Sequence, residues 1–258
     1  MALRLQVVTG GHPFEARPFF EIFDRLAESE DLVWSAVTTP EIPVQDPPDV
    51  VLFYDMPGLR FTGGGDPPVV FPEPTPDQRR VFDDLQRLGI GMVFMHHAVA
   101  SWPAWDGFAE LVGARFHYQP GNLRGIEYAD SGYVFDVTHT VETLQPFHPI
   151  CEGLEESFEL TDELYCFPVF EDDVVPIMRT RFPVDDPTRF FSADKAIRGE
   201  RDSNVGWTHP AGSDLVAWVK QAGNSRLAYL QFGDGPVTYG DVNFRRIVRN
   251  TVLWAASP

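Results

Sequence analysis

The 258-residue sequence is 43% hydrophobic and 22% charged, values of an ordinary globular protein. Its formal net charge of −18 argues against a nucleic-acid partner, which needs a basic surface, and against an anionic membrane surface, which would repel it. No apolar run approaches the 18 residues of a membrane span, and the N-terminus leads directly into a strand-like segment, so we expect a cytoplasmic protein.

The first half of the chain alternates strand-like and helix-like segments. Residues 57–74, rich in glycine and proline, are expected to form a loop. Residues 75–78 (Thr-Pro-Asp-Gln) have the pattern of a capping box with proline at the first helical position. Alternation of this kind is typical of a parallel sheet with helices on both faces. Apolar patterns predict strands over 3–8, 32–37, 49–54 and 91–95, and helices over 14–28, 75–88 and 101–111, the last capped by Ser101.

The second half favours antiparallel strands. Residues 180–206 have the charges and turn formers of a long loop, and a final helix over 241–256 would close the core. Strand-like runs cover 133–137, 158–160, 174–178, 214–219 and 226–232. We therefore expect one α/β domain over residues 1–258. Its fold class is a three-layer sandwich with a mostly parallel central sheet, plus antiparallel additions in the C-terminal half.

Cysteine and aromatic usage adds little about function. Cys151 and Cys166 do not make a disulfide framework; free thiols are expected, and a bridge between them stays open. The aromatic content of 13% favours bulky cores, and it allows a homodimer interface without requiring one.

Histidines follow two of the predicted strands. His12 comes after the first strand, and His96 and His97 follow the strand over 91–95. Ligands of open α/β sheets bind beyond the carboxyl ends of the strands, so these histidines are candidate site residues. If the strand continued through the pair, only His96 would enter the site and His97 would face elsewhere; a sharp backbone turn would relax this restriction.

Other candidates lie in later turns that could fold over the same edge: His148, His209 and the pair Asp162–Glu163. Converging imidazoles and a carboxylate could bind Zn²⁺ or a related divalent ion, with His12, His96, His148 and His209 as its ligands. Without a metal, the same histidines could act as general acid and base. The sequence has no His-Glu-x-x-His, Cys-x-x-Cys, Gly-x-Ser-x-Gly or Gly-x-Gly-x-x-Gly pattern. Aromatic side chains near these turns suit a sugar ring, with core packing as the alternative: Phe14, Trp102, Trp105, Tyr165, Trp207 and Tyr239.

The order and spacing of several motifs resemble the trehalose-utilisation, or ThuA-like, family, whose fold is similar to the flavodoxin-like fold of class I glutamine amidotransferases. The resemblance covers most of the chain. The motifs on which the resemblance rests are residues 7–13 (VVTGGHP), 91–98 (GMVFMHHA), 101–105 (SWPAW), 148–150 (HPI), 162–165 (DELY), 217–219 (AWV), 230–239 (LQFGDGPVTY), 244–246 (FRR) and 254–256 (WAA).

Two departures qualify what this resemblance implies. Family members often carry Gly-His where this chain has Gly233-Asp234, and a small residue where it has His97. Amidotransferases place their catalytic cysteine at the turn that His96 occupies here, and neither cysteine of this chain replaces it by position. The resemblance therefore implies the fold without glutaminase chemistry, together with a link to sugar metabolism, including 3-keto sugars.

Two functional hypotheses follow, both with a small-molecule carbohydrate as the partner. The first is an enzyme that acts on a sugar or keto-sugar by lyase, hydrolase or isomerase chemistry, assisted by a divalent metal such as Zn²⁺ or by no cofactor. Its catalytic residues would be His96, His12, Glu163 and Tyr165. Its substrate-binding residues would be Trp102, Trp207, Tyr239 and Asp234. The alternative is a non-catalytic carbohydrate-binding or regulatory module, which Asp234 in place of histidine favours.

Overall fold

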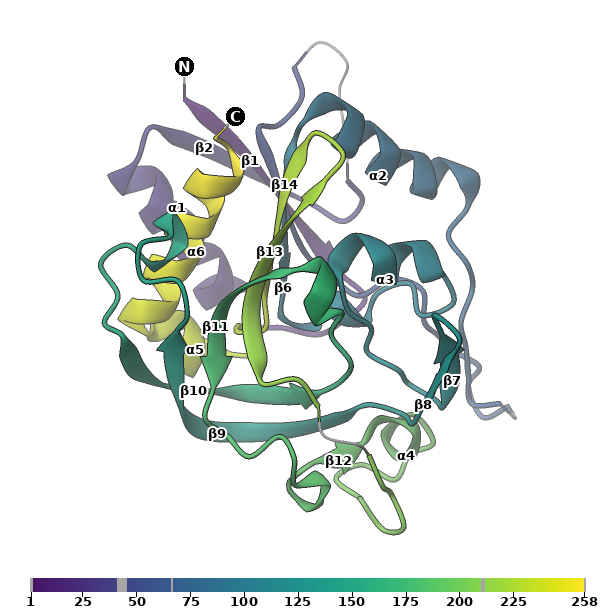
Figure 1. Cartoon of the computed structure of the whole chain (residues 1–258). Helices are drawn as coiled ribbons and strands as arrows, with labels where there is room; N and C mark the ends of the chain where they lie inside the picture. Colours follow the sequence, from purple (N-terminus) through teal and green to yellow (C-terminus); the bar gives the residue numbers. More distant parts are fainter. Residues whose placement is uncertain (1, 41–45, 66, 210–211, 258) are drawn as a thin grey trace.

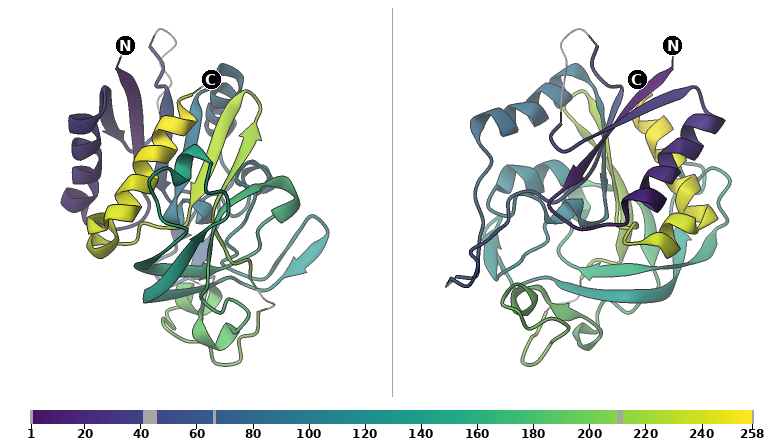
Figure 2. Two further views of the ribbon diagram at one scale, coloured as in Figure 1. Left: turned by 60° about the vertical axis from the view of Figure 1, so that its left-hand side comes forward. Right: turned by 180° about the vertical axis from the view of Figure 1, so that it is seen from behind.

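The computed structural model describes residues 2–40, 46–65, 67–209 and 212–257 (Figures 1 and 2). The strands of its main sheet are β1 (Leu3–Gly10), β2 (Leu32–Val37), β3 (Val50–Asp55), β6 (Gly91–Met95), β9 (Gly132–Thr143), β10 (Ser157–Cys166), β11 (Val175–Thr180), β12 (Phe191–Ser192), β13 (Leu215–Ala222) and β14 (Ser225–Leu230). Two short hairpins pair β4 (Arg60–Phe61) with β5 (Val69–Val70), and β7 (Gly121–Leu123) with β8 (Ile126–Tyr128). The helices are α1 (Ala16–Ser29), α2 (Pro76–Leu88), α3 (Asp106–Val112), α4 (Ala193–Ile197), α5 (Pro236–Gly240) and α6 (Val242–Ala255).

One half of the main sheet is parallel and the other half is antiparallel. The strand order is β10-β9-β11-β13-β14-β6-β3-β1-β2, with β12 paired to β9. Strands β14, β6, β3, β1 and β2 run in the same direction. Strands β13, β11, β9 and β10 add to the β14 side through antiparallel pairs. The expected fold class, a mostly parallel α/β sheet with antiparallel additions from the C-terminal half, is confirmed.

Helices cover both faces of the parallel strands and bury two apolar cores (Figure 2). Helices α1 and α6 pack on one face, where Phe19, Phe23, Phe244 and Val248 are fully buried. Helices α2 and α3 pack on the other, with Phe82, Leu85 and Phe108. Strand β6 lies between the two cores, and all five of its residues are buried, as the continuous apolar run of a parallel strand predicts.

Several local expectations hold at the level of single residues. Thr75 and Gln78 form the capping box of α2, and Gly89 ends that helix in the left-handed conformation. Asp241 caps α6 by accepting from the backbone N–H groups of Asn243 and Phe244. Cys151 and Cys166 are both buried and unbridged. In the described parts of the chain, no helix combines the length and apolarity that a bilayer crossing requires.

Other expectations are wrong in a way that matters for the site. The helix predicted from Ser101 begins only at Asp106, because residues 96–100 form a 3₁₀ turn and Trp102 adopts a φ of 48°. Ser101 is not the N-cap of that helix: it ends the 3₁₀ turn as its C-cap residue, and its hydroxyl donates to the carbonyl of Asp55. Strands β9 and β10, with 12 and 10 residues, are more than twice the predicted length. The segment 180–206 is not only loop, since it contains β12 and α4.

Candidate functional site

The ends of the parallel strands bring four segments to one edge of the sheet. Because β1, β3, β6 and β14 are parallel, the residues that follow them meet at the same edge. His12 follows β1, Met56 follows β3, His96 and His97 follow β6, and the segment 231–234 follows β14. The predicted gathering of histidines at strand ends is therefore observed for His12, His96 and His97.

His96 occupies a strained turn between a strand and a helix. Its φ of 54° lies in the left-handed region, which costs a non-glycine residue free energy and occurs mainly at functional sites. The chain passes at this residue from β6 directly into the 3₁₀ helix 96–100. This sharp turn removes the alternation of a continuing strand, so the expectation that His97 faces elsewhere is wrong. His97 lines the same cavity as His12, and the two imidazole rings are 4.5 Å apart.

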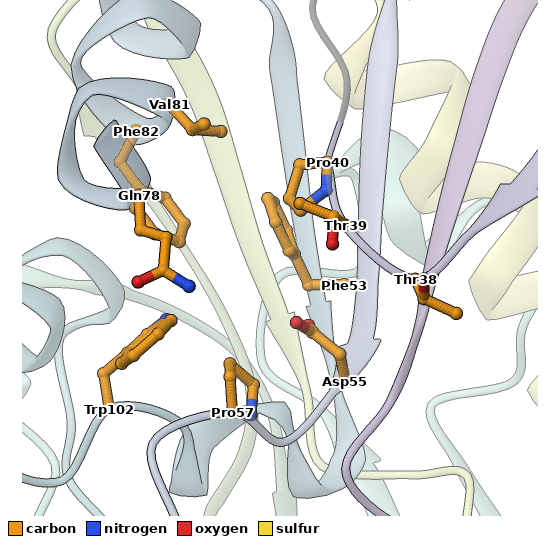
Figure 3. A pocket seen from close by; sticks show the side chains of 10 residues that line it. All are labelled: Thr38, Thr39, Pro40, Phe53, Asp55, Pro57, Gln78, Val81, Phe82 and Trp102. Carbon is orange, nitrogen blue, oxygen red and sulfur yellow. The ribbon is translucent and has the colours of Figure 1, made fainter. Parts of the chain in front are cut away.

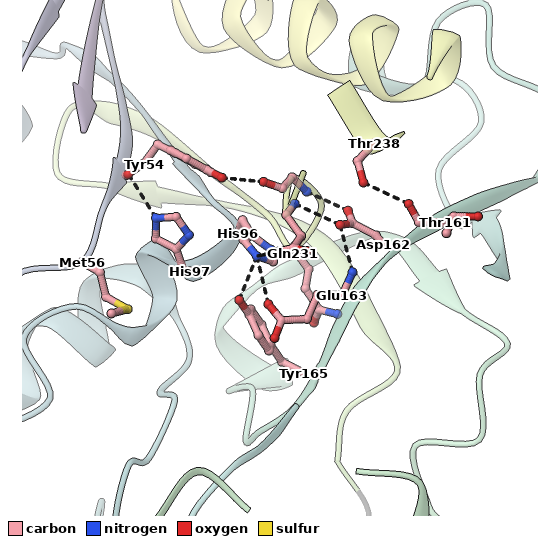
Figure 4. A network of polar contacts seen from close by, with 12 residues as sticks. Tyr54, Met56, His96, His97, Thr161, Asp162, Glu163, Tyr165, Gln231 and Thr238 are labelled. Carbon is pink, nitrogen blue, oxygen red and sulfur yellow. Dashed lines mark hydrogen bonds and ion pairs between the residues drawn. The ribbon is translucent and has the colours of Figure 1, made fainter. Parts of the chain in front are cut away.

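The imidazole of His96 is completely buried and contacts four groups, of which Figure 4 labels Gln231, Tyr165 and Glu163. Its Nδ1 lies 2.8 Å from the carbonyl oxygen of Gln231, which can only accept, so Nδ1 carries a hydrogen. Its Nε2 lies 2.9 Å from the hydroxyl of Tyr165 and 3.1 Å from a carboxylate oxygen of Glu163. A carboxylate oxygen of Asp234 is 3.5 Å from the same Nε2. We call His96, Glu163, Tyr165 and Asp234 the His96 cluster.

Strand β10 supplies two members of the His96 cluster. Side chains alternate along a strand, so Glu163 and Tyr165 point to one face while Asp162 and Leu164 point to the other. Opposite Glu163 the register shifts: two residues of β9, Phe135 and Asp136, face this single residue. Such a bulge bends the strand and redirects side chains, and here both Phe135 and Glu163 line the cavity.

Asp162, the neighbour of Glu163, has a different role. Its carboxylate accepts hydrogen bonds from the backbone N–H groups of Glu163, Gly233 and Asp234, at 2.9, 2.7 and 2.9 Å. These bonds connect β10 to the segment after β14 and hold the backbone of Glu163 and Asp234 in place. Gly233 has a φ of 127°, a conformation that side chains disfavour, and so glycine is required at this turn.

The cluster forms the floor of a cavity of about 440 Å³, which we call the sheet-edge cavity. Glu163, Tyr165 and Asp234 face it, whereas His96 lies behind them and is not exposed. Aromatic side chains form much of the wall: Phe116, Tyr118, Tyr133 and Phe135. Helix α4 contributes Ala193, Ala196 and Ile197, and Arg201 just beyond it is the one permanent cation among the described residues that line the cavity.

Burial and neighbouring charges shift the pKa values of these groups. Burial raises the pKa of Glu163, and the contacts with His96 only partly oppose it. Burial alone would lower the pKa of His96, but Asp234 and Glu163 stabilise the imidazolium and raise it to about 10. Burial, with His96 nearby, lowers the pKa of His12 and takes that of His97 well below its usual 6.5. The imidazoles of His12 and His97, which line the cavity wall and which we call the wall imidazoles, are therefore neutral at neutral pH.

The neutral wall imidazoles carry unused nitrogen atoms. His97 donates from Nε2 to the carbonyl of Tyr54 at 3.1 Å, so its Nδ1 carries a lone pair. In the part of the chain that the structure describes, this buried Nδ1 has no hydrogen-bond partner, and neither has Nδ1 of His12. Buried polar atoms are rarely left unpaired, and these two belong to side chains that line the cavity.

Comparison with known proteins places the chain in a family. A family model described as trehalose utilisation (ThuA) matches residues 69–255. The chain belongs to this ThuA family. The comparison with curated proteins finds no match. The description of the family supports a carbohydrate-related role for this member.

Similar solved structures share the fold. A ThuA-like protein of Parabacteroides merdae is 15% identical, with a TM-score of 0.66 over 100% of this chain and 91% of its own. One of Bacteroides uniformis is 17% identical, with a TM-score of 0.68 over 98% and 91%. A glutamine amidotransferase of Thermotoga maritima is 8% identical, with a TM-score of 0.52 over the whole of both chains. At these identities they show the fold alone, which is the glutamine amidotransferase-like fold expected from the sequence.

Two of the four predicted metal ligands, His148 and His209, lie outside the sheet-edge cavity, so the predicted set of four histidines does not converge. His148 packs on Trp254, next to the point where α6 contacts the start of β6, and is therefore at the amino-terminal edge of the sheet. Its Nδ1 accepts from the backbone N–H of Ile150. His209 lies beyond the end of β10, where its Nδ1 is 3.4 Å from Sγ of Cys166.

All three aromatic residues predicted to bind the substrate, Trp102, Trp207 and Tyr239, lie outside the sheet-edge cavity. Trp207 donates from Nε1 to the carboxylate of Asp130 at 3.0 Å and packs on Gly132. Tyr239 lies behind the cavity, 2.7 Å from the hydroxyl of Tyr54. Only Asp234 of the predicted substrate-binding residues faces the cavity.

Trp102 lines a second, smaller cavity of about 80 Å³ on the α2 side of the sheet (Figure 3). Here the carboxylate of Asp55 lies among Phe53, Pro57, Phe82 and the indole of Trp102. Burial raises its pKa from the usual 3.8 to about 7. The other described residues that line this cavity are uncharged, so no cation offsets the cost of ionising Asp55.

The raised pKa of Asp55 predicts that the Asp55→Asn variant is more stable than the parent protein in alkaline buffer. The folded protein resists ionisation of Asp55 between pH 4 and pH 7 and the unfolded chain does not, so this carboxyl makes the free energy of unfolding fall as the pH rises through that range. The side chain is only partly buried, so we expect a gain on the order of 2 kcal/mol at pH 8 and little difference at pH 4. Urea denaturation at both pH values measures it, with Asp83→Asn on the exposed side of α2 as the control. Equal stability of variant and parent at pH 8 would contradict the prediction.

Sequence reasoning missed several residues of the site. His97 was set aside on strand periodicity, and only the strained φ of His96 brings it in. Phe116, Tyr118, Tyr133 and Phe135 were not distinguished from core aromatics. Arg201 lies in a segment that was expected to be loop. No local pattern singles out the four aromatic residues, because all of them are distant from Glu163 in the sequence.

Proposed function

We propose that this member of the ThuA family is an enzyme that removes a proton from a keto-sugar bound in the sheet-edge cavity. One observation carries the proposal: a single cavity combines aromatic walls, two neutral imidazoles with unused nitrogens, and a floor of carboxylates and a phenol. Family membership supports the carbohydrate as the class of ligand.

The size and lining of the cavity support a sugar as its occupant. Its volume of about 440 Å³ falls within the range of small-molecule sites, roughly 300–1,000 Å³. Flat faces such as those of Phe116 and Tyr118 suit the C–H face of a sugar ring. The carboxylates of Glu163 and Asp234 and the nitrogens of His12 and His97 accept hydrogen bonds from sugar hydroxyls.

His12 is the group that we assign to proton transfer. It is neutral, and its side chain lines the cavity. When it takes a proton from the carbon beside the ketone, the electron pair of that C–H bond moves toward the ketone oxygen. That oxygen then needs a hydrogen-bond donor. The hydroxyl of Tyr118 donates only to the thioether of Met56 at 3.1 Å, a weak acceptor that a substrate oxygen would replace.

The same first step serves two of the reaction types that the sequence allowed. If the carbon next to the enolate bears a leaving group, the electron pair expels it and the reaction is a lyase elimination. If the enolate is reprotonated on the neighbouring carbon, the reaction is an isomerisation. An inverting hydrolase is less well supported, because the Glu163 and Asp234 oxygens lie within 4.8 Å and inverting enzymes separate their carboxyl groups by about 6.5–9.5 Å.

Proton exchange tests the proposal without knowledge of the final product. The purified protein is incubated in D₂O with 3-keto-glucose or a 3-keto-glucoside, and ¹H NMR follows the signal of the carbon next to the ketone. We expect that signal to disappear at least about 100-fold faster than in buffer, and His12→Asn to lose most of the acceleration. His148→Asn, a half-buried histidine at the opposite edge of the sheet, is the matched control and should exchange like the parent protein.

The outcomes separate the two hypotheses drawn from the sequence. Exchange that depends on His12 supports the enzyme. Saturable sugar binding without any exchange would overturn the proposal and leave the carbohydrate-binding module in its place. Exchange that is unchanged in His12→Asn would overturn the role of His12.

A further inference from the structure

The Nε2 atom of His96 faces more oxygen atoms than one hydrogen can bond. Tyr165, Glu163 and Asp234 each place an oxygen within 3.5 Å of it. An imidazole nitrogen has either one hydrogen or one lone pair, so a hydrogen bond satisfies only one of these three contacts well. The 3.5 Å separation from Asp234 is also longer than an ordinary N–H···O bond, for which about 2.7–3.2 Å is usual.

The same distances fit donor atoms that share one metal ion. Two ligands at about 2.1 Å from an ion are about 3.0–3.4 Å apart in octahedral or tetrahedral geometry. The separations of His96 Nε2 from the Glu163 and Asp234 oxygens are 3.1 and 3.5 Å. All three donor atoms lie within 4.8 Å of one another. An imidazole and two carboxylates are therefore placed around one point.

The surroundings of His96 also match those of a ligating histidine. A metal-bound imidazole normally donates its second N–H to a carbonyl or carboxylate, which fixes the tautomer and the ring orientation. The Nδ1 of His96 makes this bond with the carbonyl of Gln231 at 2.8 Å. A metal ion that displaces the proton on Nε2 would bind the lone pair there, on the side where the Glu163 and Asp234 oxygens lie. Two neighbouring carboxylates, one of them 8% exposed, need a positive charge between them. The His96 imidazolium supplies that charge without a metal, and a metal ion that displaces the Nε2 proton would supply it instead.

We propose that Nε2 of His96 and the carboxylates of Glu163 and Asp234 bind one divalent transition-metal ion at the floor of the sheet-edge cavity. This donor set favours Zn²⁺ and Mn²⁺, while the imidazole disfavours Mg²⁺, which prefers oxygen ligands. The site stands on its own geometry. Only the role of the ion there, polarising a substrate oxygen, rests on the proposed function. The ligand set differs from the four histidines predicted from the sequence, since it keeps only His96.

Metal titration tests the site directly. The full-length protein is stripped with EDTA, dialysed, and titrated with ZnCl₂, MnCl₂ and MgCl₂ by isothermal calorimetry, and the EPR spectrum of bound Mn²⁺ is recorded. We expect one ion per chain, with Zn²⁺ and Mn²⁺ at least 10-fold tighter than Mg²⁺. Asp234→Asn and Glu163→Gln should weaken binding of Mn²⁺ by at least 10-fold and change its EPR spectrum.

Matched variants decide the outcome. Glu159→Gln changes an exposed carboxylate four residues earlier on β10, and Asp83→Asn an exposed one on α2; both should bind like the parent protein. Circular dichroism verifies that each variant is folded, and Asp234→His, which restores a donor at that position, should recover binding. No binding by the parent protein, or equal binding by Asp234→Asn, overturns the proposal. Metal binding without proton exchange would support this site while overturning the proposed function.

Discussion

Replacing Glu163 by glutamine is expected to lower the rate of keto-sugar proton exchange by at least about 100-fold without unfolding the protein. Glu163 is the residue that touches both the buried imidazole of His96, at 3.1 Å, and the sheet-edge cavity. Glutamine keeps its size but loses the negative charge. It also presents either a neutral oxygen or an N–H₂ group to Nε2, and neither balances a cation placed between Glu163 and Asp234.

The measurement separates binding from chemistry. We expect kcat for exchange to fall more than KM rises, because aromatic walls that Glu163 does not contact contribute much of the sugar contact. Glu159→Gln is the control on the same strand and should keep both constants, since Glu159 is exposed and outside the cavity. A Glu163→Gln protein that exchanges protons at the parent rate would show that the His96 cluster is not part of the catalytic machinery.

The sequence predicted the half of the site that depends on local pattern. The apolar run before His96 is a buried parallel strand, and the end of such a strand must lie at the carboxyl edge of the sheet. His12 follows from the same rule applied to β1. Glu163 and Tyr165 were proposed from the resemblance and from their acidic neighbour, and the structure places both beside His96.

The remaining site residues come together because of the order of strands in the sheet, which no local sequence pattern shows. Strand β10 lies at the end of the sheet farthest from β2, yet Asp162 bonds to the residues that follow β14. This contact spans about 70 residues of sequence. His148 precedes β10 by only nine residues and nevertheless lies at the opposite edge, because β10 runs from one edge of the sheet to the other. Proximity in the sequence therefore misassigned His148 as a ligand.

The adjacent carboxylates Asp162 and Glu163 show why residue type alone does not assign a role. The strand turns their side chains to opposite faces. Asp162 faces backbone N–H groups and is fully paired, whereas Glu163 faces an imidazole and a cavity. Burial raises the pKa of both, so the difference between them lies in their partners. One carboxylate holds the site together and the other faces the ligand.

This division predicts that Asp162→Ala is the more damaging substitution for stability, lowering the free energy of unfolding by about 3–5 kcal/mol. Alanine leaves the N–H groups of Glu163, Gly233 and Asp234 buried without an acceptor, and each such orphan costs about 1–3 kcal/mol. Partial access of water near Asp234, whose side chain is 34% exposed, keeps the total below the sum of the three. Urea denaturation measures the loss.

Asp162→Asn refines the same prediction. Its single carbonyl oxygen can still accept from one or two of the N–H groups, while its amide N–H₂ opposes a donor, so we expect a smaller loss, about 2–3 kcal/mol. Glu163→Gln should cost less stability than Asp162→Ala, because Asp234 still faces the His96 imidazole in that variant and no backbone donor loses its acceptor. If Asp162→Ala were as stable as the parent, the contact between β10 and the segment after β14 would not hold the site. The positions of Glu163 and Asp234 would then need another cause. If Asp162→Ala is unstable and also fails to bind Mn²⁺, then Asp162 positions the metal ligands Glu163 and Asp234 although it does not itself contact the ion.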